Sequence, residues 1–206
     1  WGGAAALLSL PLVAMSFFPA AGVDWSGSDF VVMGVMLFIA CTAVEVGAHM
    51  ADNFPYLGGV IFAVGTGFVT VWANIAVGMI GDEGNPANLV FLGVLALAVI
   101  GTLVVRFTAR GMSTVMIATG AAQALVGVTV AIAGLDNLYT AALITAFALP
   151  WWLSAACFNA AGRGALADGA QAGEEQDQPG DAGDGPAQVE RSAVVAGAPR
   201  SHCGHE

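Results

Sequence analysis

Six apolar stretches occupy almost all of the first 160 residues of this chain. A transmembrane α-helix needs roughly 20 mostly apolar residues to cross about 30 Å of hydrocarbon. The apolar residues run continuously and do not alternate, which excludes the strands of a membrane β-barrel. The sequence therefore predicts an all-α fold, a polytopic transmembrane helix bundle with about six spans. The predicted spans are residues 3–20, 30–51, 57–80, 88–107, 112–134 and 138–159.

The composition also points to a chain embedded in lipid. Hydrophobic residues make up 57% of the 206 residues and charged residues only 10%, whereas a soluble domain carries about 25% charged residues. The absence of lysine excludes a Walker-type phosphate loop and lysine Schiff-base chemistry. The chain also lacks the basic surface that nucleic-acid binding requires. The expected partner is the lipid bilayer, and no cofactor is expected.

Short connections rich in Gly, Pro, Asn and Asp separate the predicted spans. Such residues end one helix or cap the next, and loops of a few residues make consecutive spans antiparallel neighbours. We expect Asp29, Asn85 and Asp136 to cap the second, fourth and sixth spans. We also expect Pro150 to kink the sixth span. Residues 1–161 should form one helical bundle.

The arginines predict how the bundle is oriented. Arg106 and Arg110 lie between the fourth and fifth spans, and Arg163 follows the sixth. Arginine in short loops favours the cytoplasmic side, so six spans place both termini in the cytoplasm. We interpret the first apolar stretch as a retained span. The alternative, a cleaved signal peptide, lacks a basic n-region and a well-formed cleavage site.

Residues 162–206 differ in composition from the bundle. They are rich in Gly, Ala, Pro and acidic residues, and too few of them are apolar to offset the entropy lost on folding. The sequence predicts a disordered cytoplasmic tail. At its end, His202, Cys203 and His205 could bind a soft metal. A structural zinc site normally needs four ligands, so we favour a solvated tail that binds no metal.

Acidic residues and histidine occur within a predicted span only in the second span. Insertion scales assign such groups a cost of roughly 2.5–3.5 kcal/mol near the bilayer centre, so they are the first candidates for function. Glu45 and His49 are one turn apart on one face, and Asp52 follows near the boundary. They could relay a proton from the aqueous edge, or ligate a metal with residues of other helices. We favour a structural role in which Glu45 is hydrogen-bonded to a neighbouring helix.

Further polar residues recur at one-turn spacing on the third and fifth spans. In antiparallel helices, several of them reach the depth of Glu45, which predicts a polar seam among spans two, three and five. Such a seam is either a proton pathway or a set of packing hydrogen bonds, which average about 0.6 kcal/mol each. The residues are Thr66, Thr70 and Asn74 on the third span and Thr119 and Gln123 on the fifth.

The stretch from Trp72 to Leu89 reads WANIAVGMIGDEGNPANL. It resembles a W-x-N-x-A-V-G-x-I-G-x-E-x-N-P-A-N signature of small bacterial inner-membrane proteins without an assigned activity. The similarity covers roughly residues 40–150, including Arg106, the turn at 110–112, residues 122–125 and an intramembrane acid at position 45. The resemblance implies a multi-pass protein of the bacterial inner membrane and no mechanism. The acidic tail departs from it.

Catalytic constellations are missing from the sequence. His49 is the only histidine in a predicted span, and neither a nucleophile elbow nor an H-E-x-x-H motif occurs. We therefore expect no enzyme. The expected function is structural or accessory, with a second copy of the chain or another membrane protein as partner. The alternative is a small proton-coupled transporter or permease that uses Glu45.

Overall fold

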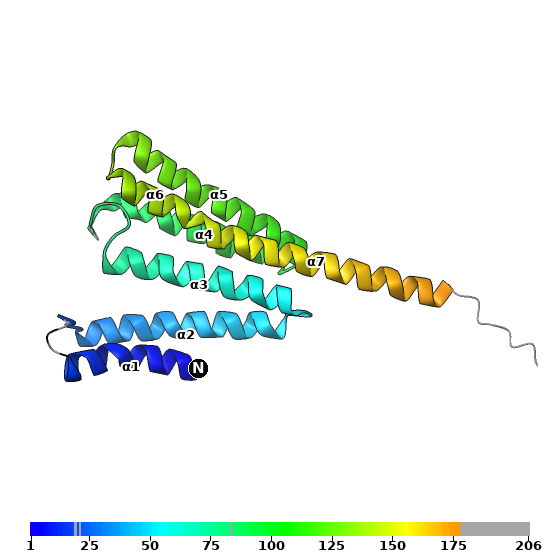
Figure 1. The fold of residues 1–206 in the computed structure, drawn as a ribbon, viewed down its shortest axis with the longest axis horizontal. Coiled ribbons are helices and arrows are strands. Elements are labelled where there is room, and N and C mark those ends of the chain that lie inside the picture. The colour runs from blue at the N-terminus through cyan, green and yellow to red at the C-terminus, as the bar shows by residue number, and fades with distance from the viewer. Residues whose placement is uncertain (19, 21, 83, 178–206) are drawn as a thin grey trace, which may run out of the picture. The chain divides into compact units, whose positions relative to one another are not determined.

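The computed structural model describes residues 1–18, 20, 22–82 and 84–177, and all the elements in this part are helices. Neighbours in sequence lie side by side, from α1 against α2 to α5 against α6 (Figure 1), as expected for antiparallel spans with short loops. The elements are α1 (Gly2–Phe17), α2 (Gly27–His49), α3 (Phe54–Ala76), the 3₁₀ helix η2 (Pro86–Leu89), α4 (Val90–Val104), α5 (Ala109–Ala133), α6 (Leu138–Ala146) and α7 (Ala148–Asp177).

Five helical segments are long and apolar enough to cross a membrane. They are α2, α3, η2 together with α4, α5, and α6 together with α7 as far as Ala167. The remaining helix, α1, is apolar and has 16 residues, a length of about 24 Å at 1.5 Å per residue. The all-helical polytopic fold predicted from the sequence is confirmed.

Polar caps set the starts of several helices. Ser26 caps α2, and its backbone N–H donates to the Asp29 carboxylate at 2.7 Å. Asp29, the third residue of the helix, is therefore the partner of Ser26 in a capping box, and the prediction that Asp29 is the cap is wrong. Asn137 caps α6, so the same prediction for Asp136 is also wrong. Asn85 caps η2, as predicted.

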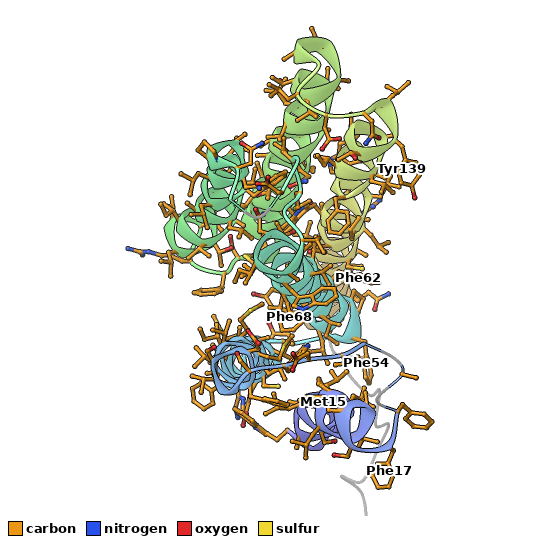
Figure 2. All side chains as sticks on the ribbon, turned by 90° about the vertical axis from the view of Figure 1, so that its left-hand side faces the viewer. Met15, Phe17, Phe54, Phe62, Phe68 and Tyr139 are labelled. Atoms are coloured by element: carbon orange, nitrogen blue, oxygen red, sulfur yellow. The ribbon has the colours of Figure 1, made fainter. Side chains whose placement is uncertain are left out.

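The core lies among α3, α4, α5 and the α6–α7 segment. Tyr56 of α3 and Phe158 of α7 meet in its main cluster, with their ring centroids 5.0 Å apart. By contrast, α1 buries no residue and α2 buries only Leu37 and Gly47. A Cβ at Gly47 would lie 2.5 Å from the Val60 side chain, so α2 meets α3 closely at this glycine. The α1–α2 hairpin thus packs on the outside of the core (Figure 2).

Large apolar side chains cover the outside of the bundle, as expected for a surface in contact with lipid tails. Phe17 is 74% exposed and Phe54 is 91% exposed. Tyr139, near the start of α6, also points away from the neighbouring helices (Figure 2). An exposed apolar surface of this extent is unusual for a soluble monomer.

The turn between α4 and α5 is tied to the core. Arg106 and Phe107 have positive φ angles of 51° and 60°, a backbone conformation that costs roughly 1–2 kcal/mol for a residue other than glycine. The Tyr56 hydroxyl of α3 donates to the Phe107 carbonyl oxygen at 2.7 Å. This hydrogen bond ties the turn to α3.

The sixth predicted span is divided at Phe147, where α6 ends before α7 begins. Pro150 has no N–H to donate to the carbonyl of Ala146, so the predicted kink falls one turn before the proline.

Beyond the sixth span, α7 continues to Asp177. The prediction of disorder is therefore wrong for residues 162–177. The stretch continues the helix of the last span without a proline, and its Ala, Gln and Glu residues favour a helix although its four glycines do not. Residues 178–206 lie outside the described part of the chain, and with them the metal candidates His202, Cys203 and His205.

Candidate functional site

Glu45 lies on the outer side of α2, and its side chain is exposed. Its carboxylate accepts a hydrogen bond from Trp1 Nε1 at 2.7 Å. The Trp1 ring also packs on Phe38, with centroids 5.6 Å apart. The start of α1 is thus joined to the last turns of α2, which is the arrangement that a structural role for Glu45 requires.

The other two candidates on this face are also exposed. His49 Nδ1 lies 2.8 Å from the backbone carbonyl oxygen of Glu45, so a protonated Nδ1 donates to its own helix. Asp52 lies just beyond the end of α2. In the described residues, no group of three or more His, Cys, Asp and Glu side chains is placed to hold a metal ion.

The threonines of the predicted seam are buried. Thr70 and Thr119 have no exposed surface, and Thr66 is 5% exposed. Each hydroxyl donates to the carbonyl oxygen four residues earlier in its own helix, at 2.6–2.9 Å. These bonds satisfy the hydroxyl protons locally, so the threonines do not link one helix to another.

The two amide side chains of the seam behave differently. Gln123 has no exposed surface, and its Nε2 donates to the Ile144 carbonyl oxygen of α6 at 3.2 Å. Asn74 is half-buried and donates to the Thr70 carbonyl oxygen of its own helix at 3.4 Å. Of the five seam residues, only Gln123 makes a side-chain hydrogen bond to another helix.

Sequence reasoning missed two serines that do join helices. Ser113 of α5 donates to the Ala155 carbonyl oxygen of α7 at 2.9 Å. Ser154 of α7 donates to the Gly59 carbonyl oxygen of α3 at 2.7 Å. Both serines are buried. Single serines in a span form no periodic pattern, so only the identity of the core-facing side of each helix could have revealed them.

These buried threonine, serine and glutamine side chains lie on α3, α5 and α7, and the predicted seam does not include α2. Glu45 precedes Gly47 by two residues, which places the two on nearly opposite sides of the helix. Because α2 contacts α3 at Gly47, Glu45 faces away from the core and toward α1. The sequence did not indicate which side of this uniformly apolar helix packs inward.

The connection from α3 to α4 folds against the bundle. The third span was predicted to reach residue 80, but α3 ends at Ala76. Met79 and Ile80 then lie buried in a second apolar cluster with Phe91 of α4 and Ile144 of α6. This connection occupies the central part of the signature-like stretch.

Asn88 holds this connection in place and is only 7% exposed. Its Oδ1 accepts the backbone N–H groups of Met79 at 3.0 Å and Ile80 at 2.8 Å. Its Nδ2 donates to the carbonyl oxygens of Asp82 at 2.7 Å and Ile80 at 3.4 Å. One buried amide thus satisfies both donors and acceptors of a loop that enters the core. This role of Asn88 was not predicted from the sequence.

Asp136 ties the same connection to the turn between α5 and α6. One carboxylate oxygen accepts the Gly81 N–H at 2.7 Å, and the other accepts the Asn137 N–H at 2.6 Å. The hydrogen bond from Gly81, followed by that from Asn137, lowers the pKa of Asp136 below its usual value. The carboxylate form is therefore favoured in the folded protein.

We expect Asp136 to make stability depend on pH at the acid end. Because its pKa is lower in the folded than in the unfolded chain, its stabilisation is complete above the ordinary carboxyl pKa of about 3.9. It is lost as the pH falls through the lowered folded value. Asp136→Asn should therefore reduce the fall of Tm with pH below about 4, measured by thermal unfolding in detergent. Asp24→Asn, at an exposed acid ahead of α2, is the control. The same pH profile in wild type and Asp136→Asn would contradict the expectation.

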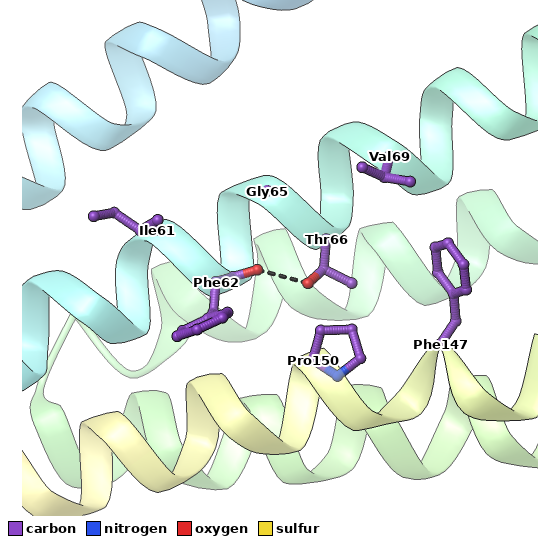
Figure 3. A pocket seen from close by; sticks show the side chains of 7 residues that line it. All are labelled: Ile61, Phe62, Gly65, Thr66, Val69, Phe147 and Pro150. Atoms are coloured by element: carbon purple, nitrogen blue, oxygen red, sulfur yellow. Dashed lines mark hydrogen bonds between the residues drawn. The ribbon is translucent and has the colours of Figure 1, made fainter.

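A groove of about 310 Å³ opens between α3 and the α6–α7 break (Figure 3). Thr66 lies in its wall, but its hydroxyl proton is directed to the Phe62 carbonyl oxygen. None of the residues that line the groove is charged. It is lined by Ile61, Phe62, Gly65, Thr66, Val69, Phe147 and Pro150.

Comparisons of the chain with protein-family models, with curated proteins and with solved structures returned no match. The resemblance of the stretch from Trp72 to Leu89 to inner-membrane proteins stays a prediction.

Proposed function

We propose that this chain is a structural or accessory multi-pass protein of the bacterial inner membrane, without catalytic or transport chemistry of its own. The observation that carries the proposal is the position of Glu45. This acid, the deepest in the predicted spans, bonds to Trp1 outside the core. The core polar side chains Gln123, Ser113 and Ser154 instead hydrogen-bond to the backbones of neighbouring helices, as packing links do.

The α1–α2 hairpin supports an accessory role. It buries only two residues, both on α2, and its remaining surface is largely apolar and exposed. A helical hairpin attached to a core in this way offers two faces to lipid, to a second copy of the chain or to another membrane protein. We propose that the partner of the hairpin is a second copy of the chain or another membrane protein.

We place the end of the bundle that carries the α4–α5 turn in the cytoplasm. Arg106 and Arg110 are exposed at this turn, and Arg163 is exposed on α7. A Cβ at Gly162 would lie 3.3 Å from Arg110 Cγ, which supports Arg110 and Arg163 lying at the same end. Arginines gathered at one end of a bundle favour the cytoplasmic side.

Glu45→Gln tests this proposal against the transporter alternative. We expect wild type, Glu45→Gln and protein-free liposomes to show equal proton flux under an imposed potential, measured with an enclosed pH-sensitive dye. The amide oxygen of glutamine still accepts from Trp1, so Tm should change little. Glu45→Leu is the matched variant, and it should lower Tm because Trp1 Nε1 loses its acceptor.

Two results would contradict the proposal. Proton flux above that of protein-free liposomes, present in wild type and lost in a folded Glu45→Gln variant, would establish the proton-coupled alternative. An unchanged Tm in Glu45→Leu would remove the structural role of the acid.

A further inference from the structure

Two polar atoms deep in the core have no hydrogen-bond partner among the described residues. They are Oε1 of Gln123 on α5 and Nε1 of Trp151 on α7. Gln123 has no exposed surface and Trp151 is 2% exposed. Leaving a buried donor or acceptor unpaired costs free energy, and buried polar atoms in native proteins are nearly always paired with protein or with ordered water.

The two atoms have complementary hydrogen-bonding roles. An indole Nε1–H only donates. The orientation of the Gln123 amide is set by the bond from its Nε2 to the Ile144 carbonyl oxygen, so the unpaired atom is the oxygen, which only accepts. A molecule that accepts one hydrogen bond and donates another would satisfy both.

The two side chains belong to the same layer of the core. Gly120 lies one turn before Gln123 on α5, and a Cβ there would lie 3.2 Å from Trp151 Cβ. The Cα–Cβ bond of Trp151 tilts toward the N-terminus of α7, and therefore toward the α6–α7 break, where Gln123 bonds to Ile144. The same Cβ would lie 2.5 Å from Trp152 Nε1, so both tryptophans pack on α5 at Gly120, and the far edge of the Trp151 ring reaches α3 at Gly67.

We propose that one ordered water molecule binds in this layer. It accepts the proton of Trp151 Nε1–H and donates to Gln123 Oε1, and so links α5 to α7 beside the helix break. Water has both roles and is small enough for a site closed on all sides. This water site is independent of the structural or accessory function proposed above.

The first test observes the water directly in the full chain in nanodiscs. With ¹⁵N-labelled tryptophan, the Trp151 indole signal is identified by its loss in Trp151→Phe. We expect a dipolar cross-peak between this indole proton and water, and its loss in Gln123→Leu. The absence of this cross-peak in wild type would overturn the proposal. So would a contact of the indole proton with the Gln123 side chain alone, which would indicate a direct bond.

A double-mutant cycle tests the link through stability. Gln123→Leu and Trp151→Phe should each lower Tm, and the double variant should lower it by clearly less than the sum, because the second change removes an atom already left unpaired. Gln123→Leu also removes the hydrogen bond to the Ile144 carbonyl oxygen. This loss is the same in the single and the double variant, so it cancels in the comparison. The control pairs Gln123→Leu with Trp25→Phe, at a tryptophan that packs on Phe30 at the start of α2, and should be additive. Additive effects of Gln123→Leu and Trp151→Phe would contradict the link.

Discussion

Gly127→Ala should destabilise the protein by about 3 kcal/mol, or roughly 6–12 °C in Tm. A Cβ at this position of α5 would lie 2.7 Å from the Thr145 backbone nitrogen and 3.0 Å from the Ala141 carbonyl oxygen of α6. Backbone atoms cannot rotate away as a side chain can, so the two helices must separate. Thermal unfolding of the purified protein in detergent measures the loss.

Gly93→Ala is the matched control for this substitution. Gly93 lies inside α4, and a Cβ there would meet nothing within 4 Å. Alanine is the better residue inside a helix by roughly 0.5–1 kcal/mol, so Tm should stay the same or rise. If Gly93→Ala and Gly127→Ala lowered Tm equally, close contact between α5 and α6 at Gly127 would be refuted.

Asn88→Leu should destabilise the protein by about 2–6 kcal/mol. The change removes all four hydrogen bonds of the side chain and leaves the buried N–H groups of Met79 and Ile80 without an acceptor. Each unsatisfied buried group costs about 1–3 kcal/mol. The loop should also open, so hydrogen exchange at these two amides should become much faster than in wild type.

Asn85→Ala serves as the control for Asn88→Leu. Asn85 makes one capping bond, from the Ala87 N–H at 3.0 Å, and losing such a cap costs about 1 kcal/mol. Amide exchange at Met79 and Ile80 should change little. Fast exchange at these amides in wild type itself would mean that the connection is not folded into the bundle.

Much of the fold could be predicted because each helix leaves a strong signal in the sequence. Long apolar runs identify the spans, and Asn85 before Pro86 predicts a helix start. Pro150 predicts the break in the sixth span. Each of these features acts locally, through hydrophobic length or backbone chemistry, and needs no knowledge of the partner helix.

The candidate site was harder to predict because it depends on which side of each helix packs inward. In a lipid-embedded chain both sides of α2 are apolar, so the sequence did not reveal that Gly47 faces the core and Glu45 faces α1. The role of Asn88 was also hidden, since it depends on a loop that folds back between helices. The helix over residues 162–177 was not predicted. The prediction of disorder rested on the polar composition of the whole tail and gave little weight to the helix propensity of Ala, Gln and Glu.

The central claim is that the chain crosses the membrane repeatedly, so that successive connections lie on opposite sides. Single cysteines at Asp82, Thr108 and Leu135, all exposed in connections, test it in a background where Cys41, Cys157 and Cys203 are replaced by alanine. In intact bacterial cells, a membrane-impermeant maleimide should label positions 82 and 135. It should label position 108 only after the membrane is permeabilised. Labelling of all three positions in intact cells would contradict the account.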